Sequence, residues 1–257
     1  MLQSVNHTYG FSIHALDGPI GEVHELLFDD RLWTLRYLVA QLGGWFDGRF
    51  VLVPAGMLLG IDSTARAIDV ALTQQQVIDS PDIGIDQPVS CQASGRFRVD
   101  YTPTYWGTAG LWGLGMGPGD PSTIARMLDA AEQDGRTPQP IGDPHLRSTR
   151  AVRGYRVHSR GGAIGHIADL IVDDTIWALR YVVIAPRISW LRKKVLAPTR
   201  WISGIDASQS RVILDAPREV VWGGPAFEPS ALADPTYEPW LRNAYAQMQA
   251  SDKAISA

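Results

Sequence analysis

The sequence contains a single cysteine, Cys91, among 257 residues. One cysteine excludes an intramolecular disulfide and any metal or redox site of the CxxC type. The six histidines form no HExxH pattern, and His14 and His158 occupy equivalent positions of an internal repeat, which favours a role in the fold. We therefore expect no metal and no cofactor.

Long apolar runs are also missing. The longest candidates, such as residues 35–42, have the length of a strand and fall far short of the roughly 20 residues of a membrane-spanning helix. The first residues lack the basic start and apolar run of a secretory signal. We expect a cytoplasmic protein without a transmembrane segment.

The charge of the chain is small and unevenly distributed. Residues 1–140 hold 8 Lys/Arg against 16 Asp/Glu, a net charge of −8, and residues 141–257 hold 15 against 11, a net charge of +4. The sum of −4 argues against general nucleic-acid binding. Two ordinary solvated surfaces, or attraction between oppositely charged parts, both account for the asymmetry.

One phrase occurs twice. DDRLWTLRYLVA begins at Asp29 and DDTIWALRYVVIA at Asp173, and a shift of 144 residues aligns residues 13–81 with residues 157–225 without a gap, with 20 identical pairs among 69 positions. Such a spacing is typical of tandem duplication of one domain, because solenoid repeats are much shorter.

Each copy has the pattern of a small β-domain. Short apolar runs with alternating burial are separated by turn residues at intervals of roughly 8–12 residues, which predicts antiparallel strands in a closed or half-open barrel. In the first copy the expected strands are 7–15, 21–28, 33–42, 50–53, 57–62 and 67–70. A short helix is expected from Thr73, which can cap it.

The repeated motifs resemble the PRC-barrel family. The resemblance rests on IGEVHELLFDDRLWTLRYLVA and IGHIADLIVDDTIWALRYVVIA, and on WFDGRFVLVP at 45–54 and WLRKKVLAP at 190–198, where Arg192 replaces the usual glycine. The family includes the cytoplasmic part of the photosynthetic reaction-centre H subunit and the C-terminal domain of the ribosome maturation factor RimM. The resemblance implies two tandem PRC-type barrels of a bacterial protein and carries no catalytic residues.

Four segments follow from these patterns. Residues 1–106 form the first barrel domain, 107–142 a Gly/Trp-rich linker, 143–229 the second barrel domain and 230–257 a helical tail. In the linker, STIARMLDAAEQ predicts a short helix capped by Ser122. The expected fold class is therefore mainly β, with short helices in the linker and at the C-terminus.

Six repeated residues are assigned structural roles. Trp33 and Tyr37 lie four residues apart, as do Trp177 and Tyr181, so we expect each pair on one strand face, with a leucine (Leu35 or Leu179) between them. Arg36 and Arg180 point to the opposite face, where an arginine among apolar neighbours needs a carboxylate. The candidate partners are Asp29, Asp30 and Glu25 in the first copy and Asp173, Asp174 and Asp169 in the second.

No catalytic set is evident, so we expect a non-enzymatic interaction or assembly module with a protein partner or a second copy of the chain. The candidate contact residues are Trp45, Phe46, Trp190, Leu191, Arg192, Lys193 and Lys194. Tryptophan is favoured at interface hot spots. One alternative is a ribosome- or RNA-associated factor that uses the arginines between Arg147 and Arg160. Another is an accessory protein related to the reaction-centre H subunit.

Overall fold

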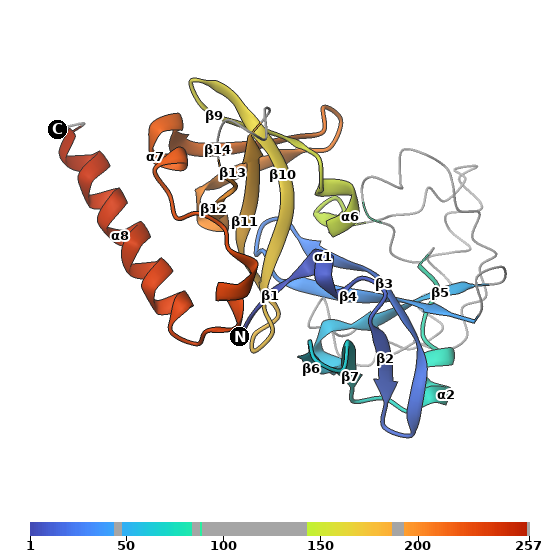
Figure 1. Ribbon diagram of the computed structural model, residues 1–257. Helices are drawn as coiled ribbons and strands as arrows, with labels where there is room; N and C mark the ends of the chain where they lie inside the picture. The colour runs from blue at the N-terminus through green and yellow to red at the C-terminus, as the bar shows by residue number, and fades with distance from the viewer. Residues whose placement is uncertain (44–47, 84–87, 89–142, 187–192, 256–257) are drawn as a thin grey trace, which may run out of the picture.

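The computed structural model describes residues 1–43, 48–83, 88, 143–186 and 193–255. The protein is mainly β: about half of it is strand, arranged in two curled sheets with a few helices (Figure 1). The fold class expected from the sequence is thereby confirmed. The predicted helix at 122–133 lies outside the described residues.

The first sheet is built by the first half of the chain in the order β5-β4-β3-β2-β7-β6. Its strands are β2 (Ser12–Ala15), β3 (Gly18–Asp29), β4 (Leu35–Leu42), β5 (Arg49–Pro54), β6 (Leu58–Asp62) and β7 (Ala67–Val70). Only β2 and β7 run parallel, and the other neighbours on this path are antiparallel. A 3-10 turn, η1 (Ala55–Met57), links β5 to β6, and α2 (Gln74–Ile78) follows β7 with the expected Thr73 cap.

The second sheet repeats this order as β12-β11-β10-β9-β14-β13. Its strands are β9 (Arg156–Arg160), β10 (Gly162–Asp173), β11 (Ala178–Pro186), β12 (Val195–Pro198), β13 (Ile202–Asp206) and β14 (Arg211–Pro217). The helical elements of this half are η2 (Thr199–Trp201), α7 (Arg218–Trp222), η3 (Pro229–Ala233) and α8 (Tyr237–Ile255). Residues that the sequence repeat aligns therefore occupy equivalent strands in the two sheets.

Each half of the chain contributes one short strand to the sheet of the other half. β1 (Leu2–Ser4) pairs antiparallel with β10, and β8 (Leu146–Ser148) pairs antiparallel with β3. The registers are equivalent, since Leu2 lies opposite Asp173 and Leu146 opposite Asp29. A one-turn helix follows each strand, α1 (Val5–Thr8) and α6 (Thr149–Val152). We call this reciprocal arrangement the strand exchange.

The length of β3 and β10 explains why the exchange is needed. Each has 12 residues, but the hairpin partners β2 and β9 cover only the first part, as far as Glu22 and His166. The exchanged strands pair with the last three residues of each long strand. Backbone groups buried without partners are costly, so a partner from the other half completes each sheet.

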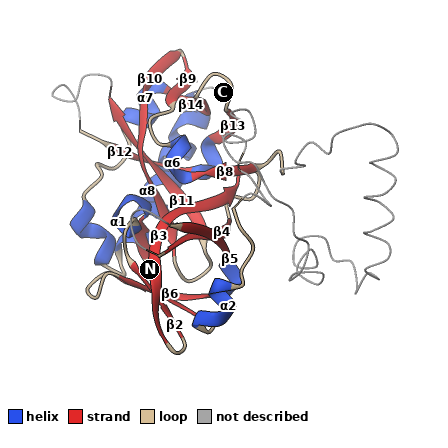
Figure 2. Cartoon of the chain, turned by 90° about the vertical axis from the view of Figure 1, so that its right-hand side faces the viewer, coloured by secondary structure: helices blue, strands red, loops and turns tan. Residues whose placement is uncertain are grey.

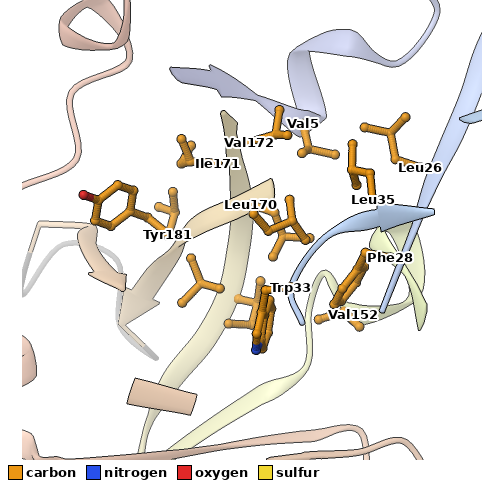
Figure 3. Close-up of a cluster of buried hydrophobic side chains, with 14 of the residues drawn as sticks. Val5, Leu26, Phe28, Trp33, Leu35, Val152, Leu170, Ile171, Val172 and Tyr181 are labelled. Atoms are coloured by element: carbon orange, nitrogen blue, oxygen red, sulfur yellow. The ribbon is translucent and has the colours of Figure 1, made fainter. Parts of the chain in front are cut away.

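The exchange is accompanied by a shared hydrophobic core. Side chains from α1, β3, α6 and β10 meet between the sheets, among them Val5, Phe28, Val152 and Leu170 (Figure 3). All four are at most 2% exposed. Because this core draws on both halves, neither sheet buries its inner face alone.

The two repeated tryptophans do not lie in strands, in contrast to the sequence expectation. Trp33 and Trp177 have left-handed backbones, with φ of 56° and 51°, in the turns before β4 and β11. There the Trp177 carbonyl accepts a hydrogen bond from the Leu35 amide (2.7 Å), and the Trp33 carbonyl accepts one from the Leu179 amide (2.6 Å). The strained turns therefore link the two sheets through backbone hydrogen bonds.

The prediction that Leu35 and Tyr37 lie on the same strand face is also wrong. The pairing of β3 with β4 contains an irregularity between Leu27 and Phe28, opposite these two residues. As a result Leu35 packs into the shared core, whereas Tyr37 packs against a separate cluster on the outer side of the first sheet. A β-bulge shifts the alternation by one residue, and a period of two cannot anticipate it.

The outer side of the second sheet is covered by α8. Leu241 and Tyr245 of this helix are fully buried, and the Tyr245 ring stacks on Tyr181 and meets Trp201 edge-on. The Tyr245 hydroxyl donates a hydrogen bond to the Leu196 carbonyl at 2.5 Å. Figure 2 shows the strands and helices in different colours, and α8 is the longest helix among the described residues.

The strand exchange predicts that the halves stay together when the connection between them is cut. A specific protease site inserted within residues 107–142 of the full chain, followed by cleavage, should leave a 1:1 complex, because β1 and β8 cross between the sheets. Size-exclusion chromatography with light scattering measures this, with guanidinium chloride as the control that separates the fragments. Separate elution under native conditions would contradict the shared core.

Candidate functional site

The first aspartate of each Asp-Asp pair holds its own turn. Asp29 Oδ1 accepts hydrogen bonds from the backbone amides of Arg31 and Leu32, at 2.9 and 3.0 Å. Asp29 Oδ2 lies 3.4 Å from Arg36 Nη1, and Asp173 Oδ2 lies 3.9 Å from Arg180 Nε. Both repeated arginines thus have the carboxylate neighbour that the sequence led us to expect. Arg180 has a second one, Glu238, 3.2 Å away.

The second aspartate of the first pair fastens the exchanged strand β8. Asp30 Oδ2 accepts a hydrogen bond from Arg147 Nε at 2.6 Å, and Asp30 Oδ1 lies 2.9 Å from His145 Nδ1. The side chains of Arg147 and Asp30 are only 11% and 10% exposed. In the other half, the Asp174 amide donates to the Met1 carbonyl at 3.1 Å. Ion pairs between the halves are thus found at Asp30, at Arg36, which lies 3.7 Å from Asp143, and at the Met1 amino group, which pairs with Asp174.

A buried carboxylate lies at each joint between an exchanged strand and the long strand. Ser148 Oγ donates to Glu25 Oε2, and Ser4 Oγ donates to Asp169 Oδ2 at 2.6 Å. Each serine also caps the one-turn helix that follows it, because its Oγ accepts a backbone amide from Ala151 or His7. One serine side chain thus joins strand, helix and carboxylate in each half.

A hydroxyl pair extends the joint around Glu25. The Tyr9 hydroxyl donates to Thr149 Oγ1 at 2.9 Å, and Thr149 Oγ1 donates to the Leu26 carbonyl at 2.8 Å. The Arg150 guanidinium lies over the Tyr9 ring, 4.5 Å from its centroid, and its Nε donates to the His24 carbonyl. This geometry is a cation–π contact at the edge of the joint.

Burial dominates the electrostatics of these groups. It raises the pKa of the Glu25 carboxyl above its ordinary value, against the opposing effects of the Ser148 hydrogen bond and the Arg150 charge. Burial likewise raises the pKa of Asp169, and it raises the pKa of the Tyr9 hydroxyl to about 12. Tyr9 therefore stays neutral at physiological pH, and both carboxyls bind protons more readily than carboxyls in water.

The arginines of the basic cluster differ in their exposure and in their partners. Arg147 is largely buried against Asp30, and Arg160 pairs with Asp215 at 2.7 Å. Arg150 is exposed but engaged with Tyr9. Arg153 and Arg156 are also exposed. Part of the cluster that suggested RNA binding thus contributes to the fold.

Two of the seven candidate contact residues lie in the described part of the chain. Trp45, Phe46, Trp190, Leu191 and Arg192 lie outside the described residues. Lys193 and Lys194 are exposed directly before β12, and the Lys194 carbonyl accepts the Phe227 amide at 2.9 Å. The two lysine side chains therefore flank the β11–β12 connection on the surface.

The joint residues Ser4, Tyr9, Ser148 and Thr149 were missed by sequence reasoning. The repeat predicted from the sequence begins at residue 13, yet equivalent residues continue upstream as Leu2/Leu146, Ser4/Ser148 and Gly10/Gly154. A serine at the same repeat position, before a four-residue helix in both halves, was the available signal for a paired cap.

Two negative findings apply to the described part of the chain. It holds no group of three or more His, Cys, Asp or Glu side chains that could bind a metal ion. None of its helices is long and apolar enough to cross a membrane.

Comparison with known proteins finds one distant similarity. No protein-family model matches the chain. An uncharacterized protein of Deinococcus radiodurans is 31% identical over 90 residues, which is 35% of this chain and 32% of that protein. The chain thus spans about a third of the length of this relative. This similarity assigns no activity to the chain, because the relative is itself described only as uncharacterized.

The Asp30–Arg147 pair generates a stability prediction. Asp30→Asn should destabilise the protein by about 3–5 kcal/mol, because it leaves the buried Arg147 guanidinium without its counter-charge. The matched control is Asp215→Asn, whose pair with Arg160 is mostly exposed and should cost less than about 1 kcal/mol. Urea unfolding of both variants measures the difference. Equal losses would show that Asp30 does not hold the strand exchange.

Proposed function

We propose that the chain is a non-enzymatic interaction and assembly module of a bacterial tandem PRC-barrel protein. The family assignment is supported by the repeated sequence motifs and is compatible with two curled sheets that share one strand order. The polar residues of the joint support a role without catalysis: Asp29, Asp30, Glu25 and Asp169 engage turn amides, arginines or hydroxyls of the fold itself.

The strand exchange is the single observation that carries this proposal. It joins two equivalent sheets through one core, so equivalent hairpins, β4–β5 and β11–β12, are held at a fixed separation. A rigid body with two equivalent hairpins can contact a partner at two points, and the second contact then forms at high effective concentration. The exposed Lys193 and Lys194 make the β11–β12 hairpin basic, which favours a partner with an acidic surface.

A second candidate function is association with RNA or the ribosome. The exposed side chains of Arg153 and Arg156 support it, whereas the engagement of Arg147 and Arg160 argues against the full cluster. The relation to the reaction-centre H subunit is proposed only as domain ancestry.

Affinity capture from native lysate, with and without RNase, tests both functions. For the assembly module we expect specific protein partners that persist after RNase and are lost in a Lys193→Glu/Lys194→Glu variant. The matched control is Arg153→Glu/Arg156→Glu, which reverses the same amount of charge elsewhere and should leave those partners bound. Loss of the partners on RNase treatment, together with loss in the arginine variant, would replace the proposal by the RNA function.

A further inference from the structure

The two joints differ in how well the buried carboxylate is satisfied. Asp169 accepts three hydrogen bonds: from Ser4 Oγ at 2.6 Å, from the Asn6 amide at 3.1 Å and from the Leu170 amide at 2.7 Å. Glu25 is only 6% exposed, and among the described residues the structure shows one donor to its carboxyl, Ser148 Oγ. An ionised carboxylate with one hydrogen bond is poorly compensated in a buried site.

The groups around Glu25 do not supply a close counter-charge. Ser148 of β8 is neutral, and so is Tyr9, which directly follows α1 and lies within range of the Glu25 charge. From α6 the Arg150 charge acts on it, but this guanidinium is exposed and lies over the Tyr9 ring. On β3 itself His24 is adjacent, and burial lowers the pKa of that imidazole, which favours its neutral form.

We propose that Glu25 makes the attachment of β8 and α6 to the first sheet sensitive to pH. With a neutral carboxyl the joint is closed, because Ser148 and Glu25 then form an uncharged hydrogen-bonded pair in an apolar setting. Ionisation of Glu25 leaves a buried charge with one donor, and the joint opens more often so that water can reach the carboxylate. This device concerns the connection between the halves and is independent of which partner the protein binds.

The direction of the effect follows from linkage. The pKa of Glu25 is raised in the closed joint, so the closed joint holds the proton more tightly than the open one. The closed joint is therefore most stable at and below the ordinary glutamate pKa of 4.5, and loses stability as pH rises through the raised pKa. Within that window the equilibrium constant for closing the joint falls by up to about tenfold per pH unit, as expected when one proton is released.

Hydrogen exchange across a pH series tests the proposal on the full chain. After correction for the intrinsic exchange rate, protection of peptides that cover residues 146–152 should fall with rising pH in the wild type. Glu25→Gln should remove this fall and keep protection high at the upper end of the series. The matched control is Asp169→Asn at the other joint, which should leave the pH dependence of residues 146–152 in place.

A second pair of variants keeps the test decisive if Glu25→Gln does not fold. Ser148→Ala removes the single donor, so it should raise the Glu25 pKa further and extend the fall in protection to higher pH, whereas Ser4→Ala should leave the profile of residues 146–152 unchanged. A pH-independent wild type, a Glu25→Gln profile that still falls, or a Ser148→Ala profile that coincides with the wild type would each overturn the proposal.

Discussion

The structure depends on one constraint: in the second half of each long strand, β3 and β10, one edge has no hairpin partner. β3 and β10 continue beyond their hairpin partners, and a strand from the other half of the chain pairs with the last three residues of each. A buried backbone group without a partner costs as much as a lost hydrogen bond or more. The exchange, the shared core and the contact between the turns at Trp33 and Trp177 all follow from satisfying this one requirement twice.

The same requirement explains the polar residues of the joint. An exchanged strand of three residues makes few ladder bonds, so side chains must hold it in register. Ser4 and Ser148 do so by capping the next helix and donating to a carboxylate, and Asp30 adds a buried ion pair to β8. Such groups are costly to bury and strongly destabilising to leave unpaired, which makes them suited to specifying one arrangement of the halves.

The sequence was informative where the pattern is long and local. The repeat, the main strands and the amphipathic α8 could be predicted, because alternation and helical spacing extend over many residues. The exchange could not, since three residues carry too little periodicity to reveal their partner. A left-handed tryptophan and a bulge between β3 and β4 beside Leu35 contradict local propensity, so the alternation of residue types does not reveal them. Consequently the joint residues were missed, while Arg36 and Arg180 were correctly given carboxylate neighbours.

Differences between the two halves are therefore more informative about function than their common residues. The residues that both halves share at the joint, such as Asp29 and Asp173, are engaged by the fold that both halves form. At equivalent positions, Glu25 stands against a better-satisfied Asp169, Tyr9 stands against Arg153, and Phe50 stands against Lys194. Two halves with one architecture and unlike surfaces can present two different contacts to one partner, which a symmetric pair of identical subunits cannot do.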